Sequence, residues 1–445
     1  MINSRLFAIR NPLIIQERIQ PVYSQFILRY DSIDFPIYVN DSAAEILRLC
    51  DGRKSIMEIY KNLSEKYKEP IVDLENKLND FWDMSIKCKY IYFSETPMKE
   101  PLMLEQTGSC EYWTPDLISV ELTHICPLKC KHCFLSAGKG NTMQKSTWDA
   151  IFNSVIEMKI SQVQLTGGEP LLHPSFFDFL NLLLNNNVTV HIFTSGVIFS
   201  EDIFKKIKEY AEKYPKKILF QVSIDGLSDY HDRFRGVIGS FERTIYFVKK
   251  IVEMGLRTSV GVTVSEQSFC ELKSLCELCR DIGVSIVRVG GITNRGRAEK
   301  NGLGSKEDEI ANIIDVKNKI AAELNSDTFK VLLNEESNDD SLNYLMNCGL
   351  GQTSIKIDPI GNVYPCMMAE VKYADINKNS LLEIQKKYSR IFEKIKHPTS
   401  FTCQNCKDRM ICEKCIVEGY AHSIKHKCTW VNENLDTLKQ CFWGN

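Results

Sequence analysis

Eleven of the 17 cysteines of this 445-residue chain gather in two places, and in both their spacing is typical of metal ligands. The first group is Cys126, Cys130 and Cys133, in the pattern C-x3-C-x2-C. Structural zinc takes four protein ligands, usually from paired CxxC motifs, so this triplet fits zinc poorly. An iron–sulfur cubane with one non-protein ligand fits it better. The alternative is a tight turn whose three cysteines bind no metal.

The second group occupies the last 98 residues, which hold eight of the 17 cysteines. Seven of them form a series with a G-x4-C step and two CxxC pairs: Cys348, Cys366, Cys403, Cys406, Cys412, Cys415 and Cys428. Two CxxC pairs alone favour zinc, which is the alternative for 403–415. Cys348 and the step that ends at Cys366 favour iron–sulfur instead, because a simple zinc ribbon needs neither. Bound metal can replace a hydrophobic core in such a segment.

The composition is that of a globular chain. Hydrophobic residues make up 44% and charged residues 25%, and the formal net charge of −2 gives no sign of a basic surface for nucleic acid or an anionic membrane. No apolar run approaches the roughly 20 residues that a membrane span needs. The first 30 residues carry charges throughout, unlike a signal peptide. We therefore predict a cytoplasmic protein with reduced thiols and with no membrane or nucleic-acid partner.

The elements that position the first cysteine group lie in residues 116–300, where strand-like and amphipathic helical stretches alternate. This pattern predicts an α/β fold, either a partial (β/α)6 barrel or a doubly wound sheet. The expected strands are Leu117–Leu122, Gln162–Leu165, Val188–Phe193, Ile218–Ile224, Thr258–Val264 and Ser285–Val289. Ligands of such folds bind at the carboxyl ends of the strands. The cysteine triplet, Gly167-Gly168-Glu169, and Ser223 with Asp225 all follow or end such strands.

The flanking regions predict separate domains. Residues 1–95 predict short strands, three helices and a closing strand, which together form a winged-helix-like α+β domain. The second helix opens with a capping box made by Ser55 and Glu58. Prolines and a glycine in 96–115 indicate a linker. Residues 301–345 predict a charged helical bridge, and we expect residues 346–445 to form a Cys-rich iron–sulfur domain.

Several of these motifs together resemble the radical S-adenosylmethionine (SAM) enzymes. They are the C-x3-C-x2-C loop, T-G-G-E-P at 166–170, S-I-D at 223–225 and H-D-R-F-R-G at 231–236. The resemblance implies that Cys126, Cys130 and Cys133 hold a catalytic [4Fe–4S] cluster whose fourth iron binds SAM. It also implies SAM contacts at His132, Gly167, Gly168, Glu169, Ser223, Asp225 and Arg235. For Arg235 an ordinary salt bridge is an equal alternative. Ser195 stands where relatives often have Asn, and we assign it no role.

The second cysteine group resembles the SPASM extension of peptide-modifying radical SAM enzymes, which carries two auxiliary [4Fe–4S] clusters. The ligand order of that family implies one full set: Cys403, Cys406, Cys412 and Cys428. It implies only three ligands for the inner cluster, which are Cys348, Cys366 and Cys415. The open iron would bind a substrate thiolate, because a coordinating metal deprotonates a thiol. Cys441 and Cys110 are the alternative occupants of that position.

The stretch Asn40–Gly52 resembles the PqqD-like element that recognises precursor peptides. The resemblance implies that a leader peptide adds as a strand beside the small sheet of residues 1–95. A DNA-binding winged helix is the alternative, but a recognition helix for DNA needs clustered Lys and Arg. Residues 46–50 offer only Arg48, and Asp41 and Glu45 lie nearby. Peptide binding is therefore the better interpretation.

All three parts together resemble the sactisynthases, which form thioethers in ribosomally made peptides. The resemblance implies hydrogen abstraction by a 5′-deoxyadenosyl radical and a C–S crosslink to a substrate cysteine. It also implies two partners: a Cys-containing precursor peptide, and an external one-electron reductant of the flavodoxin or ferredoxin type. One alternative is C–C crosslinking or another peptide modification by the same cofactors. The non-enzymatic alternative is a zinc-containing peptide-binding protein.

Overall fold

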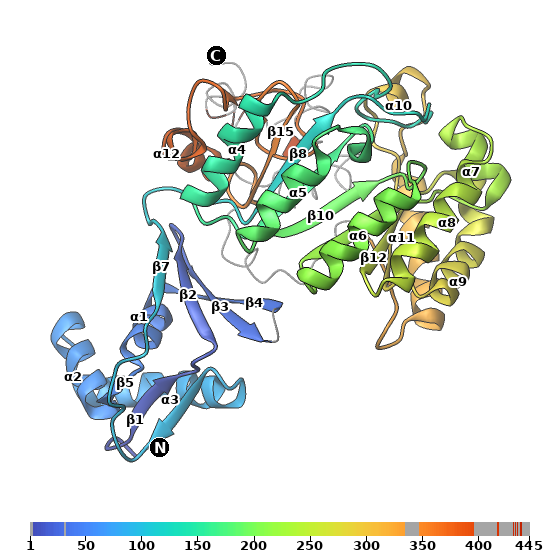
Figure 1. Ribbon diagram of the computed structural model, residues 1–445. Coiled ribbons are helices and arrows are strands. Elements are labelled where there is room, and N and C mark those ends of the chain that lie inside the picture. The colour runs from blue at the N-terminus through green and yellow to red at the C-terminus, as the bar shows by residue number, and fades with distance from the viewer. Residues whose placement is uncertain are drawn as a thin grey trace. The chain divides into compact units, whose positions relative to one another are not determined.

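The computed structural model describes residues 3–30, 33–333 and 347–395, together with 416–417, 430, 432, 434 and 437. The chain divides into two compact units, Met1–Trp113 and Thr114–Asn445 (Figure 1). Among the described residues, no helix is long and apolar enough to cross a membrane.

The first unit contains two sheets and three helices. The smaller sheet is antiparallel, in the order β5 (Asp51–Ser55), β1 (Phe7–Arg10) and β6 (Ile91–Ser94). The larger has the order β4 (Ile33–Val39), β3 (Ser24–Tyr30), β2 (Ile14–Ile19) and β7 (Glu105–Gly108). The helices are α1 (Asp41–Leu49), α2 (Ile56–Tyr67) and α3 (Ile71–Lys87). The predicted capping box is present, because the Ser55 and Glu58 side chains each bond the other residue's backbone N–H.

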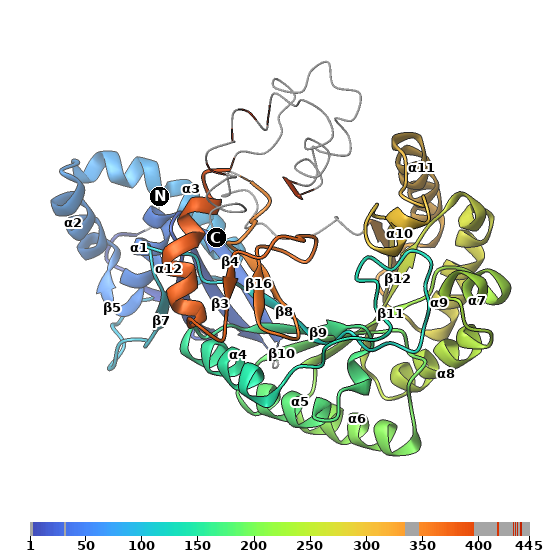
Figure 2. The same ribbon diagram turned by 90° about the horizontal axis from the view of Figure 1, so that it is seen from above.

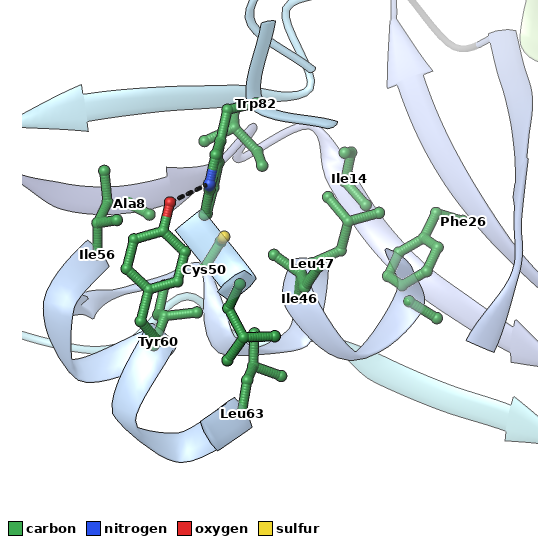
Figure 3. Close-up of a cluster of buried hydrophobic side chains, with 14 of the residues drawn as sticks. Ala8, Ile14, Phe26, Ile46, Leu47, Cys50, Ile56, Tyr60, Leu63 and Trp82 are labelled. Carbon is green, nitrogen blue, oxygen red and sulfur yellow. Dashed lines mark hydrogen bonds between the residues drawn. The ribbon is translucent and has the colours of Figure 1, made fainter. Parts of the chain in front are cut away.

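One hydrophobic core joins the helices of this unit to both sheets (Figure 3). Phe26, Leu47 and Ile56 are almost completely buried in it. Trp82 is also fully buried, and its indole Nε1 donates a 3.0 Å hydrogen bond to the Tyr60 hydroxyl. A buried indole N–H needs such a partner, so this bond fixes how α3 packs on α2.

The stretch that we predicted as a linker packs on the first unit. Its strand β7 runs parallel to β2, and the Leu102 N–H donates to the Asp51 carbonyl at 2.9 Å. The buried Arg10 guanidinium bonds the carbonyls of Leu47 and Leu102 at 3.0 and 3.1 Å. Residues 96–113 therefore belong to this unit, because their backbone groups pair with its strands rather than with each other. The prolines on which the linker prediction rested exclude a helix in this segment, but they do not exclude a strand.

The second unit is built on one ten-stranded sheet. Its order is β14 (Lys330–Leu333), β13 (Ile286–Gly290), β12 (Arg257–Thr263), β11 (Ile218–Ser223), β10 (Thr189–Thr194), β9 (Gln162–Gly167), β8 (Leu117–Thr123), β15 (Ser354–Ile357), β16 (Asn362–Tyr364) and β17 (Ala374–Asp375). The first eight of these are parallel, and β16 and β17 continue the sheet in antiparallel fashion. This confirms the predicted partial barrel.

Helices cover the outer side of this curved sheet (Figure 2). They are α4 (Lys145–Glu157), α5 (Phe176–Asn185), α6 (Glu201–Lys213) and α8 (Ser240–Glu253). The strands alternate accordingly: in β8, Val120 and Leu122 are fully buried in the apolar layer, and Ser119 and Glu121 point to the opposite face. The interior of a closed barrel is filled by branched apolar side chains. Here the inner face carries polar side chains, among them Ser119 and Glu121 of β8.

One segment of the second unit differs from the prediction, and another adds a helix for which we had predicted no element. The helical bridge at 301–345 contains α11 (Glu307–Leu324), but β14 follows it and extends the parallel sheet beside β13. The four residues of β14 are too few to show a periodicity, although Val331 and Leu333 are buried as alternation requires. Beyond Cys366, α12 (Leu381–Phe392) is amphipathic and begins with a capping box at Ser380.

Candidate active site

The loop with the first three cysteines leaves β8 and lies against the end of α7 (Ser228–Arg235). The N–H groups of Lys129 and Lys131 donate to the carbonyls of Arg235 and Phe234, at 2.9 and 3.0 Å. The loop therefore satisfies helix carbonyls that a helix end leaves without partners. Gly236 follows with φ 72°, and a Cβ there would stand 2.9 Å from the Lys129 carbonyl oxygen. Only glycine permits this close contact.

The three thiols lie in a common apolar setting. Cys130 is buried, and Cys126 and Cys133 are half-buried beside Leu128 and Val197. Burial raises the pKa of the Cys126 thiol to about 12. A cation or metal must therefore supply the stabilisation that a thiolate needs here.

Arg297 fixes the shape of this loop from the opposite side. Its guanidinium Nε donates to the Cys130 carbonyl at 2.7 Å, and its backbone N–H donates to the Cys133 carbonyl at 2.9 Å. The preceding Gly296 has φ 57°, and a Cβ there would overlap the Phe134 carbonyl. The sequence analysis did not find Arg297, because nothing near residue 297 marks it as a neighbour of the cysteines.

A buried ion pair stands beside the cysteine loop. The Arg235 Nε is 2.6 Å from Asp225 Oδ2, and both side chains are almost inaccessible to solvent. Burial alone would raise the pKa of Asp225, but the Arg235 charge, the nearby His132 and His231 and the Arg235 hydrogen bond together outweigh it, and the pKa lies below its ordinary value. The second nitrogen, Nη1, points to Cys130 Sγ at 3.8 Å. Arg235 thus places one donor on a carboxylate and another on a predicted cluster ligand.

His132 lies in the same buried group. Its ring stacks on Phe234 with centroids 4.2 Å apart, and its Nε2 is 3.8 Å from Asp225 Oδ2. Burial lowers the pKa of His132 to about 4, so the imidazole is neutral at physiological pH. Its Nδ1 is buried and has no hydrogen-bond partner among the described residues. A buried nitrogen without a partner is costly, and a bound ligand would supply one.

The two glycines of the T-G-G-E-P motif hold β9 against the cysteine loop. The Gly168 N–H donates to the Thr123 carbonyl at 2.5 Å, and the Glu169 N–H donates to the Ile125 carbonyl at 2.9 Å. A Cβ on Gly167 or Gly168 would overlap the backbone of residues 123–125. We expected these glycines to admit a ligand. In the structure, the absence of side chains at these two glycines allows the backbone of the cysteine loop to approach β9 closely.

The Glu169 carboxylate is completely buried and fully bonded. It accepts from the Thr194 hydroxyl at 2.7 Å, from the backbone N–H and the hydroxyl of Ser195 at 3.0 and 2.5 Å, and from the Leu171 N–H at 3.3 Å. Burial raises the pKa of Glu169, and the Ser195 and Thr194 hydrogen bonds oppose that shift. The sequence analysis assigned Ser195 no role, and the structure gives it one in orienting Glu169. Its place in the T-S-G tripeptide after β10 was the available signal.

Ser223 ends β11 and is half-buried, two residues before Asp225. It faces Gly261 of β12 in the parallel register. The structure therefore brings Ser223, Asp225, Arg235 and His132 to one edge of the sheet with the cysteine triplet. Their contacts with SAM remain predictions.

Only part of the second cysteine group falls within the described residues. Cys348 is exposed, and Cys366 is half-buried directly after the β15–β16 hairpin. The other predicted ligands, Cys403, Cys406, Cys412, Cys415 and Cys428, lie outside the described residues, as does Cys441. Cys110 is exposed in the first unit. In the described ranges, no three His, Cys, Asp or Glu side chains gather closely enough to hold one metal ion.

The residues at the first site fit an iron–sulfur cubane with an organic ligand. Each cysteine of a cubane binds a different iron, so its ligands lie farther apart than those of a single ion. The Arg235 guanidinium supplies positive charge beside Cys130, and the unpartnered His132 Nδ1 leaves a polar atom for a ligand. A cluster of perturbed, buried titratable groups is typical of a functional site.

Three family models match the chain. They are the Radical SAM superfamily at residues 120–279, the SPASM iron–sulfur cluster-binding domain at 348–407 and the coenzyme PQQ synthesis protein D (PqqD) at 36–91.

Proteins of known function and solved structures are similar to this chain over the same regions. The antilisterial bacteriocin subtilosin biosynthesis protein AlbA of Bacillus subtilis is 25% identical over 422 residues, 90% of each chain. The sporulation killing factor maturation protein SkfB of the same species is 23% identical over 294 residues, 66% of this chain and 69% of SkfB. The crystal structure of Streptococcus suis SuiB bound to precursor peptide SuiA has a TM-score of 0.64 at 16% identity, covering 95% of this chain and 98% of that one. At that identity it shows a shared fold. The chain is a radical SAM enzyme of the peptide-modifying type, with a PqqD domain before its catalytic domain and a SPASM domain after it.

Proposed function

We propose that this enzyme forms Cys thioether crosslinks within a ribosomally made precursor peptide. The observation that carries the proposal is the place of Cys366 in the sheet. β15 pairs in parallel with β8, the strand that leads to Cys126, and Cys366 directly follows the β15–β16 hairpin. One sheet therefore supports both the predicted radical source and a predicted thiol-binding segment.

The first site would hold a [4Fe–4S] cluster on Cys126, Cys130 and Cys133, with SAM on its open iron. When bound, the two supply a 5′-deoxyadenosyl radical that removes a hydrogen atom from a substrate carbon. The Arg235 guanidinium stabilises the Cys130 thiolate and holds Asp225 ionised. Glu169 is held in place by Ser195 and Thr194, and His132 keeps a neutral imidazole available to the ligand.

Two auxiliary clusters would occupy the SPASM domain, with Cys348, Cys366 and Cys415 on the inner one. An open iron there would bind the substrate thiolate and lower the pKa of that thiol. The electron balance is complete in this arrangement. C–S bond formation takes a hydrogen atom from the substrate carbon and a proton from the substrate thiol, which leaves one electron. The centre that Cys348, Cys366 and Cys415 would hold would supply an acceptor for that electron. An external one-electron reductant of the flavodoxin or ferredoxin type would reduce the first cluster in the cytoplasm.

The inner face of the sheet suits a peptide. Its polar side chains alternate with the buried apolar ones in successive strands: Gln164, His191, Gln221, Ser259 and Arg288. Amides removed from water need hydrogen-bond partners, and these side chains offer donors and acceptors. Burial and the nearby charges of Arg257 and Arg288 lower the pKa of His191 to about 4, so its ring is neutral.

The first unit would bind the leader of the precursor by strand addition. β4 stands at the end of its sheet, and it leads directly into α1, within the PqqD match. An edge strand presents unpaired backbone groups to an incoming strand. The exposed Phe35 on β4 offers an apolar contact for it. The solved complex of SuiB with precursor peptide SuiA supports a peptide partner for this fold.

The test combines metal analysis with product analysis. The enzyme is produced with the Cys-containing peptide encoded beside its gene, reconstituted anaerobically and assayed with SAM and dithionite. We expect about twelve irons per chain and little zinc. The product should lose two hydrogen atoms per crosslink, and each crosslinked cysteine should resist alkylation. Loss of hydrogen with every cysteine still alkylated would instead indicate C–C crosslinking.

Replacing Cys126, Cys130 and Cys133 with Ala provides the matched control. The triple variant should keep about eight irons per chain and lose SAM cleavage, because only the first cluster is removed. Retained cleavage would refute the assignment of these cysteines. About four irons with one or two zincs in the wild-type protein would refute the auxiliary clusters.

A further inference from the structure

A buried ion pair connects the two strands that lead to the two cysteine sites. The Lys356 Nζ of β15 lies 3.5 Å from Glu121 Oε1 of β8, and the side chains are only 8% and 3% exposed. Removing two such charges from water costs several kcal/mol, and an apolar pair would often serve stability as well. The other contacts of these two side chains show what the pair holds together.

Lys356 holds the turn that carries Cys366. Its Nζ donates to the Ala369 carbonyl at 3.2 Å and lies 4.3 Å from the centre of the Tyr364 ring. The Ala369 N–H in turn donates to the Cys366 carbonyl at 3.2 Å, which closes the turn. One ammonium thus contacts the turn on both sides of Cys366, through a carbonyl and through an aromatic face.

Glu121 holds the start of the other cysteine loop. Its second oxygen, Oε2, lies 3.0 Å from His124 Nε2. The His124 carbonyl accepts from the Gly138 N–H at 2.9 Å, and the Gly138 carbonyl accepts from the Cys126 N–H at 3.2 Å. The path from Lys356 through Glu121 and His124 therefore reaches the backbone of the first predicted cluster ligand.

A second, independent contact joins the same two regions. The Gln164 Nε2 of β9 lies 3.3 Å from the sulfur of Met367, the residue after Cys366. β9 is the strand that ends in the two glycines pressed against the cysteine loop. The Cys366 turn is thus fixed to both strands that support the first site.

We propose that Lys356 is a positioning residue that couples the Cys126–Cys133 loop to the Cys366 turn. A ligand that orders the loop then also orders the turn, so the two sites respond together. The inference rests on the proposed function only in assigning cluster ligands to these cysteines. The coupling itself is a property of the contacts between Lys356, Glu121 and His124.

The test measures amide hydrogen exchange in the reconstituted, full-length enzyme with SAM as the only added ligand. In the wild type, SAM should slow exchange in residues 121–138 and also in 364–370. Lys356→Met should keep the first response and lose the second. Lys372→Met is the matched control, because Lys372 is an exposed lysine of the same segment that donates to Asn362 rather than to the Cys366 turn. A response at 364–370 that survives in Lys356→Met would overturn the proposal, as would its equal loss in Lys372→Met.

A double variant separates coupling from mere stability. Lys356→Met leaves the buried Glu121 charge unpaired and should lower the midpoint of thermal unfolding. Glu121→Gln in the same chain removes that charge, so the midpoint should recover while the response at 364–370 stays lost. Recovery of both would show that the pair only stabilises the fold and would overturn the proposal. The wild-type crosslinking assay decides the proposed function separately, because the exchange response needs no peptide.

Discussion

Each unit of the molecule contains a buried carboxylate paired with an arginine, and the two pairs differ in what else the arginine contacts. In the first unit, the completely buried Glu17 accepts from Arg48 Nε at 2.8 Å and from Gln106 Nε2 at 2.8 Å. In the second, the completely buried Asp225 accepts from Arg235 Nε at 2.6 Å. Both carboxyl groups have a pKa below the ordinary value.

The difference lies in the remaining donors of each guanidinium. Arg48 places Nε and Nη2 on Glu17 and is 36% exposed, so its pair ties α1 to β2 and reaches no reactive group. Arg235 is buried and directs Nη1 to Cys130 Sγ. A buried ion pair by itself therefore indicates nothing about chemistry. What distinguishes a structural ion pair from one at an active site is the group that the arginine contacts with its remaining N–H donors.

Of the changes considered, Arg235→Met should cause the largest losses of both stability and SAM cleavage. It leaves Asp225 buried without a counter-charge, which costs about 3–5 kcal/mol of unfolding free energy. SAM cleavage should be lost as well, because Cys130 loses its cationic neighbour. Urea unfolding of the metal-free chain measures the first effect. Asp225→Asn in the same chain should restore most of the stability but none of the cleavage, and restored cleavage would show that Arg235 acts on the fold alone.

A smaller effect is expected from Arg48→Met. Glu17 loses its counter-charge, but the Arg48 guanidinium is partly solvated, so the loss of unfolding free energy should be about 2 kcal/mol. Peptide-independent SAM cleavage should stay at the wild-type rate, because the first unit holds none of the predicted ligands of the first cluster. A fall in cleavage comparable to that of Arg235→Met would remove the contrast between the two pairs.

The smallest expected effect is the change in the pH dependence of stability when Glu17 is replaced. Burial alone would raise the pKa of Glu17, but the hydrogen bonds from Arg48, Gln106 and Ser24 and the Arg48 charge together lower it further than burial raises it. Its contribution to stability is therefore present above the unfolded carboxyl pKa and is lost as pH falls through the lowered folded pKa. When the pH is lowered from 7 to below the unfolded carboxyl pKa of about 4.3, the unfolding midpoint of the metal-free chain should fall less in Glu17→Gln than in the wild type. Parallel curves would contradict this.

The sequence predicted the parts of the fold that rest on local patterns. The expected strands at Leu117–Leu122 and Ile218–Ile224 agree with β8 and β11 within a residue, because their alternation reflects one helix-covered face. The capping box at Ser55 was found from two side chains three positions apart. The cysteine triplet and Asp225 were predicted near one another because parallel strands end at one edge, whereas Arg235 was named only through the family resemblance.

The remaining features depend on contacts between distant parts of the chain. Ser195 bonds Glu169, Arg297 bonds the Cys130 carbonyl, and Lys356 pairs with Glu121, each across a long separation in sequence. No periodicity or motif spacing encodes such partners. The strand β7 inside the connector at 96–115 was not expected for the same reason, since it forms only because β2 is beside it.

The pairing of β15 with β8 also affects how the protein is synthesised. Leu117 is paired with Ser354, so one edge of β8 stays unpaired until its partner strand, roughly 240 residues later in the chain, has been synthesised. At about 5–20 residues per second, that delay on the ribosome is on the order of 10–50 seconds. During this time an apolar strand edge beside the cysteine loop is open to wrong pairing. The nascent chain should therefore depend on chaperones more than a protein whose neighbouring strands follow each other in sequence.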